Sequence, residues 1–189
     1  FSEKWCHTDD PYGFLAWCIE YNKVLNNPEY PYALATALDA TCSGIQIYSG
    51  LLRDRQGAQA VNVIGQHRND IYGMVAEVAN RILHDREYDR YLSFTNANGE
   101  VTETDFRPIG DSLAGKITRS ISKRNTMTQP YSVTMKGMQE QLKETFNELE
   151  EDGKKFWVGE VWQVSRLLAE IHQKAIDEAK SRDILLSLH

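Results

Sequence analysis

Apolar residues recur at helical spacing over most of this chain, and the clearest run covers residues 68–84. Within it Ile71, Val75, Val78 and Ile82 would share one face of a helix. The same periodicity predicts further helices over about 43–54, 112–128, 135–149 and 158–180. Most of the chain is therefore expected to be helical.

Residues at the ends of these runs support the helix assignments. Asp10 followed by Pro11 is typical of a helix start, and Asn27-Pro28 ends the helix that begins there. Gly153 would cap the 135–149 helix. In the 43–54 helix the expected inward face consists of Ile45, Tyr48, Leu51 and Leu52.

Two short segments have strand character. Residues 32–38 alternate between alanine and larger side chains, which predicts a strand leading into the 43–54 helix. Asn98-Gly99 is a strong turn dipeptide, so residues 91–104 are expected to form a β-hairpin or an exposed loop. The predicted fold class is mixed α+β and mostly α-helical.

Composition places the chain among ordinary globular proteins. It has 189 residues, of which 41% are hydrophobic and 25% are charged, so a packed core is expected. No run of about 18 apolar residues occurs, so no membrane span is expected. The three cysteines lack a CxxC spacing, which favours a reducing compartment. The first residue is Phe1 rather than Met, so the chain is expected to be a piece of something longer.

The charge distribution is uneven. The net charge of −6 argues against a nucleic-acid binder, but residues 107–143 hold seven Lys or Arg against two acids. A basic segment inside an acidic chain suits an anion such as phosphate. A solvated basic helix face would have the same composition.

A first candidate for chemistry is Asp39, at the end of the predicted 32–38 strand. Magnesium in proteins is commonly held by one or two carboxylates together with substrate phosphates. The small residues from Ala40 to Gly44 would let a substrate approach the backbone. The alternative is that Asp39 simply caps the next helix, which is common.

A second candidate is the basic segment 118–131. Arg119 and Lys123 are four residues apart, so they would share a helix face. Arg can grip a phosphate with two hydrogen bonds, and Lys can deliver a proton. Tyr131, a little over two turns further on, would offer a stacking surface with a polar tip.

Taken together, Asp-x4-Gly on a strand-to-helix turn and Arg-x3-Lys-x7-Tyr on a helix resemble motifs A and B of the single-subunit RNA polymerases of phages and mitochondria. Further matches follow the family's order over about residues 5–175: CSGIQ (42–46), LLRD (51–54), AVN (60–62), DIYG (70–73), LAG (113–115), TRS (118–120) and KR…MT (123–128).

This resemblance implies a role for each motif residue. Asp39 and the carbonyl of Ala40 would bind catalytic Mg²⁺. Arg119 and Lys123 would hold the incoming triphosphate, and Lys123 would protonate the leaving pyrophosphate. Tyr131 would close over the nascent base pair and help to select ribose.

Two positions favour RNA over DNA synthesis. Related DNA polymerases place a Glu five residues after the catalytic Asp, where it blocks a 2′-hydroxyl, and this chain has Gly44 there. They also carry an aromatic residue four after the Lys, and this chain has Met127.

The resemblance also predicts an incomplete enzyme. Catalysis needs two metal ions about 3.5–4 Å apart. The family's second aspartate lies in a His-Asp hairpin far beyond motif B, and the chain ends at His189 before that point. His84-Asp85 precedes motif B and is expected to be a surface helix end. The family's Gly after the tyrosine is replaced by Ser132, and Pro130 is expected to end or kink the helix near Gln129.

The implied organisation is that of a right-hand polymerase in part. Residues 1–67 would be a partial palm with motif A, and residues 68–189 would be fingers with motif B and an insertion at 91–104. The expected partners are a DNA template, an RNA product, NTPs and a second polypeptide or segment that completes the palm. The expected location is the cytoplasm of an infected bacterium, or alternatively the mitochondrial matrix. A non-catalytic DNA-binding or scaffolding protein derived from a polymerase is the alternative function.

Overall fold

The computed structural model describes residues 3–35, 40–95, 99 and 101–181, and it divides the chain into two compact units, 1–39 and 40–189. The described part is mostly helical with one small antiparallel sheet, so the mixed α+β, mostly helical expectation is confirmed. The proposed division into palm and fingers at residue 67 stays a prediction.

The first unit contains a short 3₁₀ helix, η1 (Glu3–His7), and the helix α1 (Pro11–Asn26). As expected, Asp10 caps α1 by accepting a 3.1 Å hydrogen bond from the Gly13 backbone N–H. The strand expected over 32–38 is wrong for its described part. Residues 30–35 have no regular secondary structure, and residues 36–39 lie outside the described residues.

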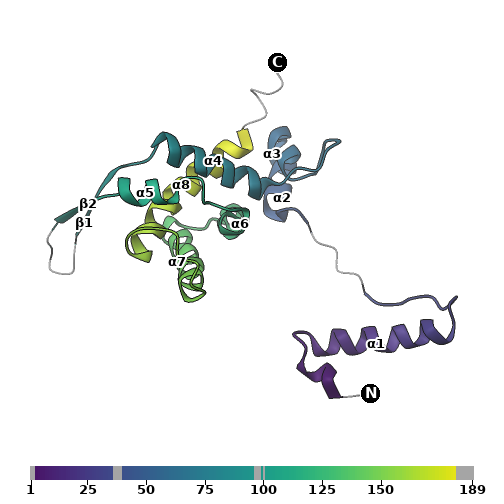
Figure 1. The fold of residues 1–189 in the computed structure, drawn as a ribbon. Coiled ribbons are helices and arrows are strands. Elements are labelled where there is room, and N and C mark those ends of the chain that lie inside the picture. The colour runs from purple at the N-terminus through teal and green to yellow at the C-terminus, as the bar shows by residue number, and fades with distance from the viewer. Residues whose placement is uncertain (1–2, 36–39, 96–98, 100, 182–189) are drawn as a thin grey trace. The chain divides into compact units, whose positions relative to one another are not determined.

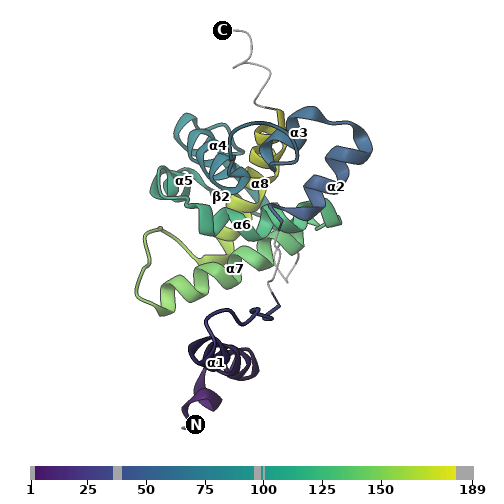
Figure 2. The ribbon, with the colours of Figure 1, turned by 90° about the vertical axis from the view of Figure 1, so that its right-hand side faces the viewer.

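The second unit is built from helices that pack around one core (Figure 1). They are α2 (Ser43–Leu52), α3 (Arg55–Ala60), α4 (Ile71–Asp85), α5 (Arg107–Leu113), α6 (Arg119–Thr128), α7 (Met135–Glu151) and α8 (Val161–Ser181). The long helix α8 packs against α4 and α7, and it also contacts α3, α5 and α6. Figure 2 shows α6 between α2 and α7, and α6 contacts both of these helices.

The expected hairpin is confirmed. Strands β1 (Tyr91–Thr95) and β2 (Val101–Asp105) pair antiparallel, with Tyr91 opposite Asp105 and Thr95 opposite Val101. Gly99, in the connection between them, has φ +81°, a backbone conformation that glycine adopts without strain.

The single helix expected over 112–128 is wrong, because α5 and α6 are separate helices. Gly115 lies between them with φ +75°, a backbone conformation that interrupts a helix. The segment after the break is held by Asn80 of α4, whose amide donates to the Ile117 carbonyl and accepts from the Ile117 N–H at 2.8 and 3.0 Å. This pairing sets where α6 begins.

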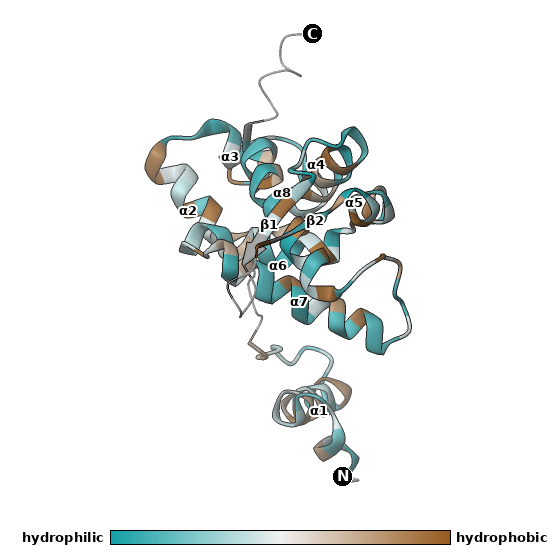
Figure 3. Cartoon of the chain, turned by 90° about the vertical axis from the view of Figure 1, so that its left-hand side faces the viewer, coloured by the Kyte–Doolittle hydropathy of each residue, from teal (hydrophilic) through white to brown (hydrophobic). Residues whose placement is uncertain are grey.

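The apolar face expected for α2 is largely wrong. Ile45 is buried, whereas Tyr48, Leu51 and Leu52 are 48–74% exposed. Ile47, on another side of the helix, is also exposed at 58%. Figure 3 shows hydrophobic positions, in brown, along α2.

Candidate functional site

The two cations expected to share a face of α6 do so, and they lie over one aromatic ring. The guanidinium carbon of Arg119 is 5.0 Å from the centroid of the Tyr72 ring, and Lys123 Nζ is 6.0 Å from it. Arg119 Nε also donates a 2.8 Å hydrogen bond to Asp70 Oδ2. Asp70 is the N-cap residue of α4, so the start of α4 supports the basic face of α6.

Tyr72 is a buried, neutral ring. Its side chain is 5% exposed, and burial, followed by the neighbouring Cys42, raises the pKa of its phenol to about 12. Cys42 is itself buried, which raises the pKa of its thiol, and its Sγ is 3.7 Å from the Thr126 carbonyl. The start of α2 is thus attached to α6 beside the two cations.

Several basic residues of the 107–143 segment form ion pairs with carboxylates, and Lys123 differs from them in this respect. Arg107 is paired with Asp105 and Arg124 with Glu144. Among the residues that the structure describes, no carboxylate lies within 4.0 Å of Lys123 Nζ. Lys123 is exposed and contacts an aromatic ring, an arrangement open to an anionic ligand.

Helix α6 ends at Thr128, as Pro130 predicted. A 3₁₀ turn, η2 (Gln129–Tyr131), follows, and Ser132 adopts φ +61°. Tyr131 therefore does not continue the α-helix that carries Lys123, and the direction expected from helical spacing is wrong. Tyr131 is 63% exposed, and its hydroxyl lies 3.3 Å from Ser43 Oγ at the start of α2.

Gly44 lies where α2 meets this turn. A Cβ atom at Gly44 would be 2.8 Å from Pro130 Cβ and 3.1 Å from Tyr131 Cζ, closer than side chains normally approach. The missing side chain therefore lets η2 pack against α2. Packing is therefore a second reason for glycine at this position, in addition to the expected room for a ribose 2′-hydroxyl.

Asp39 lies outside the described residues, so its role in binding Mg²⁺ stays a prediction. The helix that follows it begins at Ser43, and Cys42 rather than Asp39 occupies the N-cap position. The alternative that Asp39 caps α2 stays open, because the Asp39 side chain is outside the described part of the chain. Ala40 is exposed, and Thr41 Oγ1 accepts a 3.3 Å hydrogen bond from Asn62 Nδ2.

A buried polar network that the sequence interpretation missed holds α6 in place. His172 of α8 is fully buried, with Nδ1 2.9 Å from Asn125 Oδ1 and Nε2 3.2 Å from Ser122 Oγ. The Asn125 amide continues to the Met138 carbonyl and to Gln141 of α7. Burial lowers the pKa of His172 to about 3. The available signal was the spacing Val164-Leu168-His172, which puts a histidine in line with the apolar face of α8.

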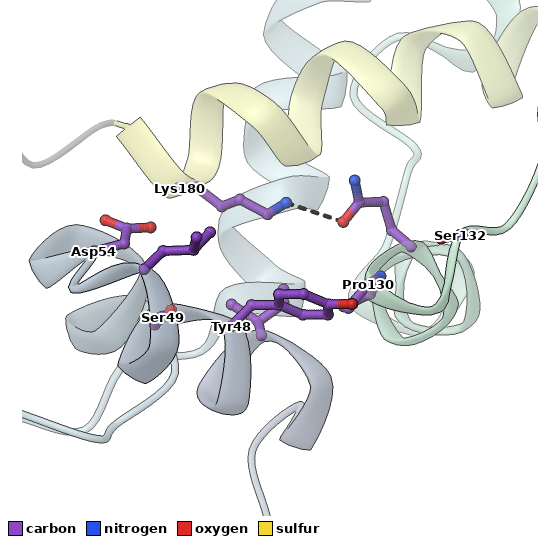
Figure 4. A pocket seen from close by; sticks show the side chains of 9 residues that line it. Tyr48, Ser49, Asp54, Pro130, Ser132 and Lys180 are labelled. Carbon is purple, nitrogen blue, oxygen red and sulfur yellow. Dashed lines mark hydrogen bonds between the residues drawn. The ribbon is translucent and has the colours of Figure 1, made fainter.

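Two cavities adjoin the site. One of about 330 Å³ lies between α2, η2 and α8, where Lys180 Nζ donates to Gln129 Oε1 at 2.9 Å (Figure 4). The other, of about 710 Å³, lies between α6 and α7 and is lined in part by Lys123 and Met127. Met127 is 42% exposed.

The structure also describes the His84-Asp85 pair and shows where other side chains of the types that bind metals lie. His84 and Asp85 form the exposed end of α4 and pair with each other at 3.0 Å, as expected for a surface helix end. Within the described part of the chain, no three His, Cys, Asp or Glu side chains gather closely enough to hold a metal ion. Nor does any helix there have the length and apolarity needed to cross a membrane.

Comparison with known proteins identifies relatives of nearly the whole chain. A family described as DNA-dependent RNA polymerase matches residues 2–183. The T7 RNA polymerase of Escherichia phage T7 is 36% identical over 151 residues, which are 74% of this chain and 17% of that protein. The DNA-directed RNA polymerase of Enterobacteria phage K11 is 33% identical over 67% of this chain and 15% of its own length.

An organellar enzyme matches over a longer stretch. DNA-directed RNA polymerase 1, mitochondrial, of Arabidopsis thaliana is 29% identical over 182 residues, which are 92% of this chain and 17% of that protein. The chain thus spans about a sixth of the length of the curated relatives it matches.

Proposed function

The chain belongs to the phage-type, single-subunit DNA-directed RNA polymerase family, and on that premise we propose that it supplies the triphosphate grip and part of the palm of such an enzyme. It would bind the incoming NTP and Mg²⁺ for template-directed RNA synthesis. A second polypeptide or a further segment would carry the other catalytic aspartate.

The observation that carries this proposal is the pair of cations on the Tyr72 ring. Arg119 and Lys123 lie at motif B positions and face one side of α6. Arg119 would bind phosphate oxygens with two N–H groups, and Lys123 would hold the leaving pyrophosphate and deliver a proton to it. Stabilising charge that develops on a phosphoryl group is the main task of a phosphoryl-transfer site.

Asp39 and the carbonyl of Ala40 would provide the chain's share of the magnesium site. A carboxylate and a carbonyl are hard oxygen ligands of the type Mg²⁺ takes, with substrate phosphates completing its coordination. What supports this role is the match of Asp39 to motif A of the family, and the N-cap position of the next helix is taken by Cys42. When bound, the ions would activate the attacking hydroxyl and neutralise charge on the phosphates.

Ribose selection would fall to Gly44 and Tyr131. Gly44 has no side chain to exclude a 2′-hydroxyl, and the Tyr131 ring lies against it. The hydroxyl of Tyr131 points to Ser43, from the segment that also contains Asp39. These contacts support a ribose-selecting role even though Tyr131 lies beyond the end of α6.

A partner surface is needed for this assignment, and α2 offers one. Its exposed apolar residues, Ile47, Leu51 and Leu52, are 58–74% exposed along one short helix. Such a surface is costly to leave in water, and it is typical of an interface. We assign it to the segment that completes the palm.

Primer extension tests the proposal. The chain is combined with candidate completing polypeptides, an RNA primer on a DNA template, Mg²⁺ and either rNTPs or dNTPs. Magnesium-dependent extension with rNTPs is expected, with dNTPs used at least tenfold less efficiently. Extension that prefers dNTPs would replace the assignment with a DNA polymerase.

One observation favours the alternative of a non-catalytic DNA-binding or scaffolding protein. The Tyr131 ring fills the space beside Gly44 where a sugar would be expected. DNA binding by the assembled complex without any nucleotide addition would support that alternative.

A further inference from the structure

We propose that Tyr72 is a positioning residue that sets Arg119 and Lys123 as a preformed pair for a triphosphate. This inference rests on the proposed function, and it assigns a role to a residue that touches no substrate. Tyr72 belongs to α4, whereas both cations belong to α6, so the arrangement depends on the packing of these two helices.

The geometry leaves the phosphate-binding edge of Arg119 open. Its Nε–H donates to Asp70, and its guanidinium carbon lies 5.0 Å from the centroid of the Tyr72 ring. These two contacts restrict where the guanidinium can lie. Among the described residues the structure records no hydrogen bond from the two terminal nitrogens of Arg119. That terminal edge is the one that binds two phosphate oxygens side by side.

The ring also reduces the cost of holding two positive charges together. Lys123 Nζ is 6.0 Å from the same ring centroid, so both cations interact with its negative face. Long Lys and Arg side chains lose considerable rotamer entropy when a ligand immobilises them. Because Tyr72 contacts both side chains and Asp70 also holds Arg119, less entropy remains to be lost when phosphate binds.

The burial of Tyr72 makes the platform rigid. The side chain is 5% exposed, so the ring cannot follow the cations if they move. Its pKa is raised to about 12, and the phenol is neutral at physiological pH, as that of tyrosine ordinarily is. The ring therefore acts through its face and its position, and the hydroxyl is not required.

Binding of inorganic tripolyphosphate to the full 189-residue chain, measured by calorimetry at low ionic strength, tests this role. Tyr72→Phe keeps the ring and should bind within twofold of the wild type. Pentafluorophenylalanine at position 72 keeps the shape but reverses the charge distribution of the ring, so binding should weaken at least threefold relative to Tyr72→Phe. Tyr72→Leu, which removes the ring, should weaken binding at least fivefold.

A double-mutant cycle separates positioning from general destabilisation. The variant Arg119→Ala/Lys123→Ala should bind at least tenfold more weakly, and Tyr72→Leu should add no further loss in that background. Equal binding by the Phe and pentafluorophenylalanine variants, or a further loss from Tyr72→Leu, would overturn the inference. If Arg119→Ala/Lys123→Ala binds as the wild type does, the triphosphate grip of the proposed function fails instead. No binding by the wild-type chain would contradict a preformed pair.

Discussion

His172 of α8 and Asn125 of α6 are joined by a buried hydrogen bond of 2.9 Å, and this bond fixes the helix that carries the candidate triphosphate grip. Asn125 lies two residues after Lys123 on the opposite side of α6. The cations therefore face out from a helix whose other side is held by a fully satisfied polar network.

This network predicts acid sensitivity. The unfolded chain protonates His172 below its ordinary pKa of 6.5, whereas the folded chain does not until about pH 3. Between these values the unfolded state binds more protons, so the free energy of unfolding should fall as the pH falls, by up to about 1.4 kcal/mol per pH unit. Above pH 6.5 this contribution should not vary.

Urea unfolding between pH 4 and 7.5 measures this effect. His172→Gln cannot titrate, so it should be less stable at neutral pH but should lose less stability on acidification. His84→Gln is the control, because the side chain of His84 is 85% exposed. Identical pH profiles for the wild type and His172→Gln would contradict the prediction.

Gly44→Ala should destabilise the chain by about 1–3 kcal/mol, because the added Cβ would overlap the rigid Pro130 ring. Gly50→Ala is the matched control in the same helix, since nothing lies within 4 Å of its Cβ position. That substitution should stabilise α2 by up to about 1 kcal/mol. Thermal and urea unfolding of both variants compare them, and equal effects would show that Gly44 is not needed for the contact with η2.

Ser132→Gly should stabilise the chain by about 1 kcal/mol, because Ser132 has φ +61°, where a side chain is strained. The resemblance places glycine at this position, so the structure keeps the backbone conformation although the residue differs. Ser132→Ala, which retains Cβ, should give no such gain. A Ser132→Gly variant no more stable than Ser132→Ala would contradict this explanation.

Lys123→Ala should weaken NTP affinity and slow nucleotide addition at least tenfold in the assembled enzyme, because the charge that faces the site is lost. Arg124→Ala removes a neighbouring charge that is already paired with Glu144 of α7. It should therefore change both quantities less than twofold. Steady-state kinetics over a range of NTP concentrations compares the two, and equal losses would indicate a nonspecific charge effect.

The sequence predicted most helices because their stability comes from local periodicity and caps. The run 68–84 and the cap at Asp10 depend on residues within a few positions of each other, and both were found close to where they were expected. The break between α5 and α6 depends instead on Asn80, 37 residues from Ile117. A long-range pairing of this kind leaves no periodic signal.

The candidate site was predictable only where it depends on local spacing. The shared face of Arg119 and Lys123 follows from their spacing, whereas their support by Tyr72 requires α4 to pack against α6. Helix α2 shows that local spacing can also mislead. Its apolar spacing predicts burial, but Leu51 and Leu52 are each 74% exposed.

The most direct test of the central claim is magnesium-dependent nucleotide addition by the assembled polymerase with Asp39→Asn. Asparagine caps a helix as well as aspartate does but lacks the charge that holds Mg²⁺. Asp54→Asn is the control, since Asp54 caps α3 through Gln56 and Gly57. Our account predicts that Asp39→Asn abolishes nucleotide addition while DNA binding is retained, and that Asp54→Asn stays active. Nucleotide addition by Asp39→Asn at the wild-type rate would contradict it.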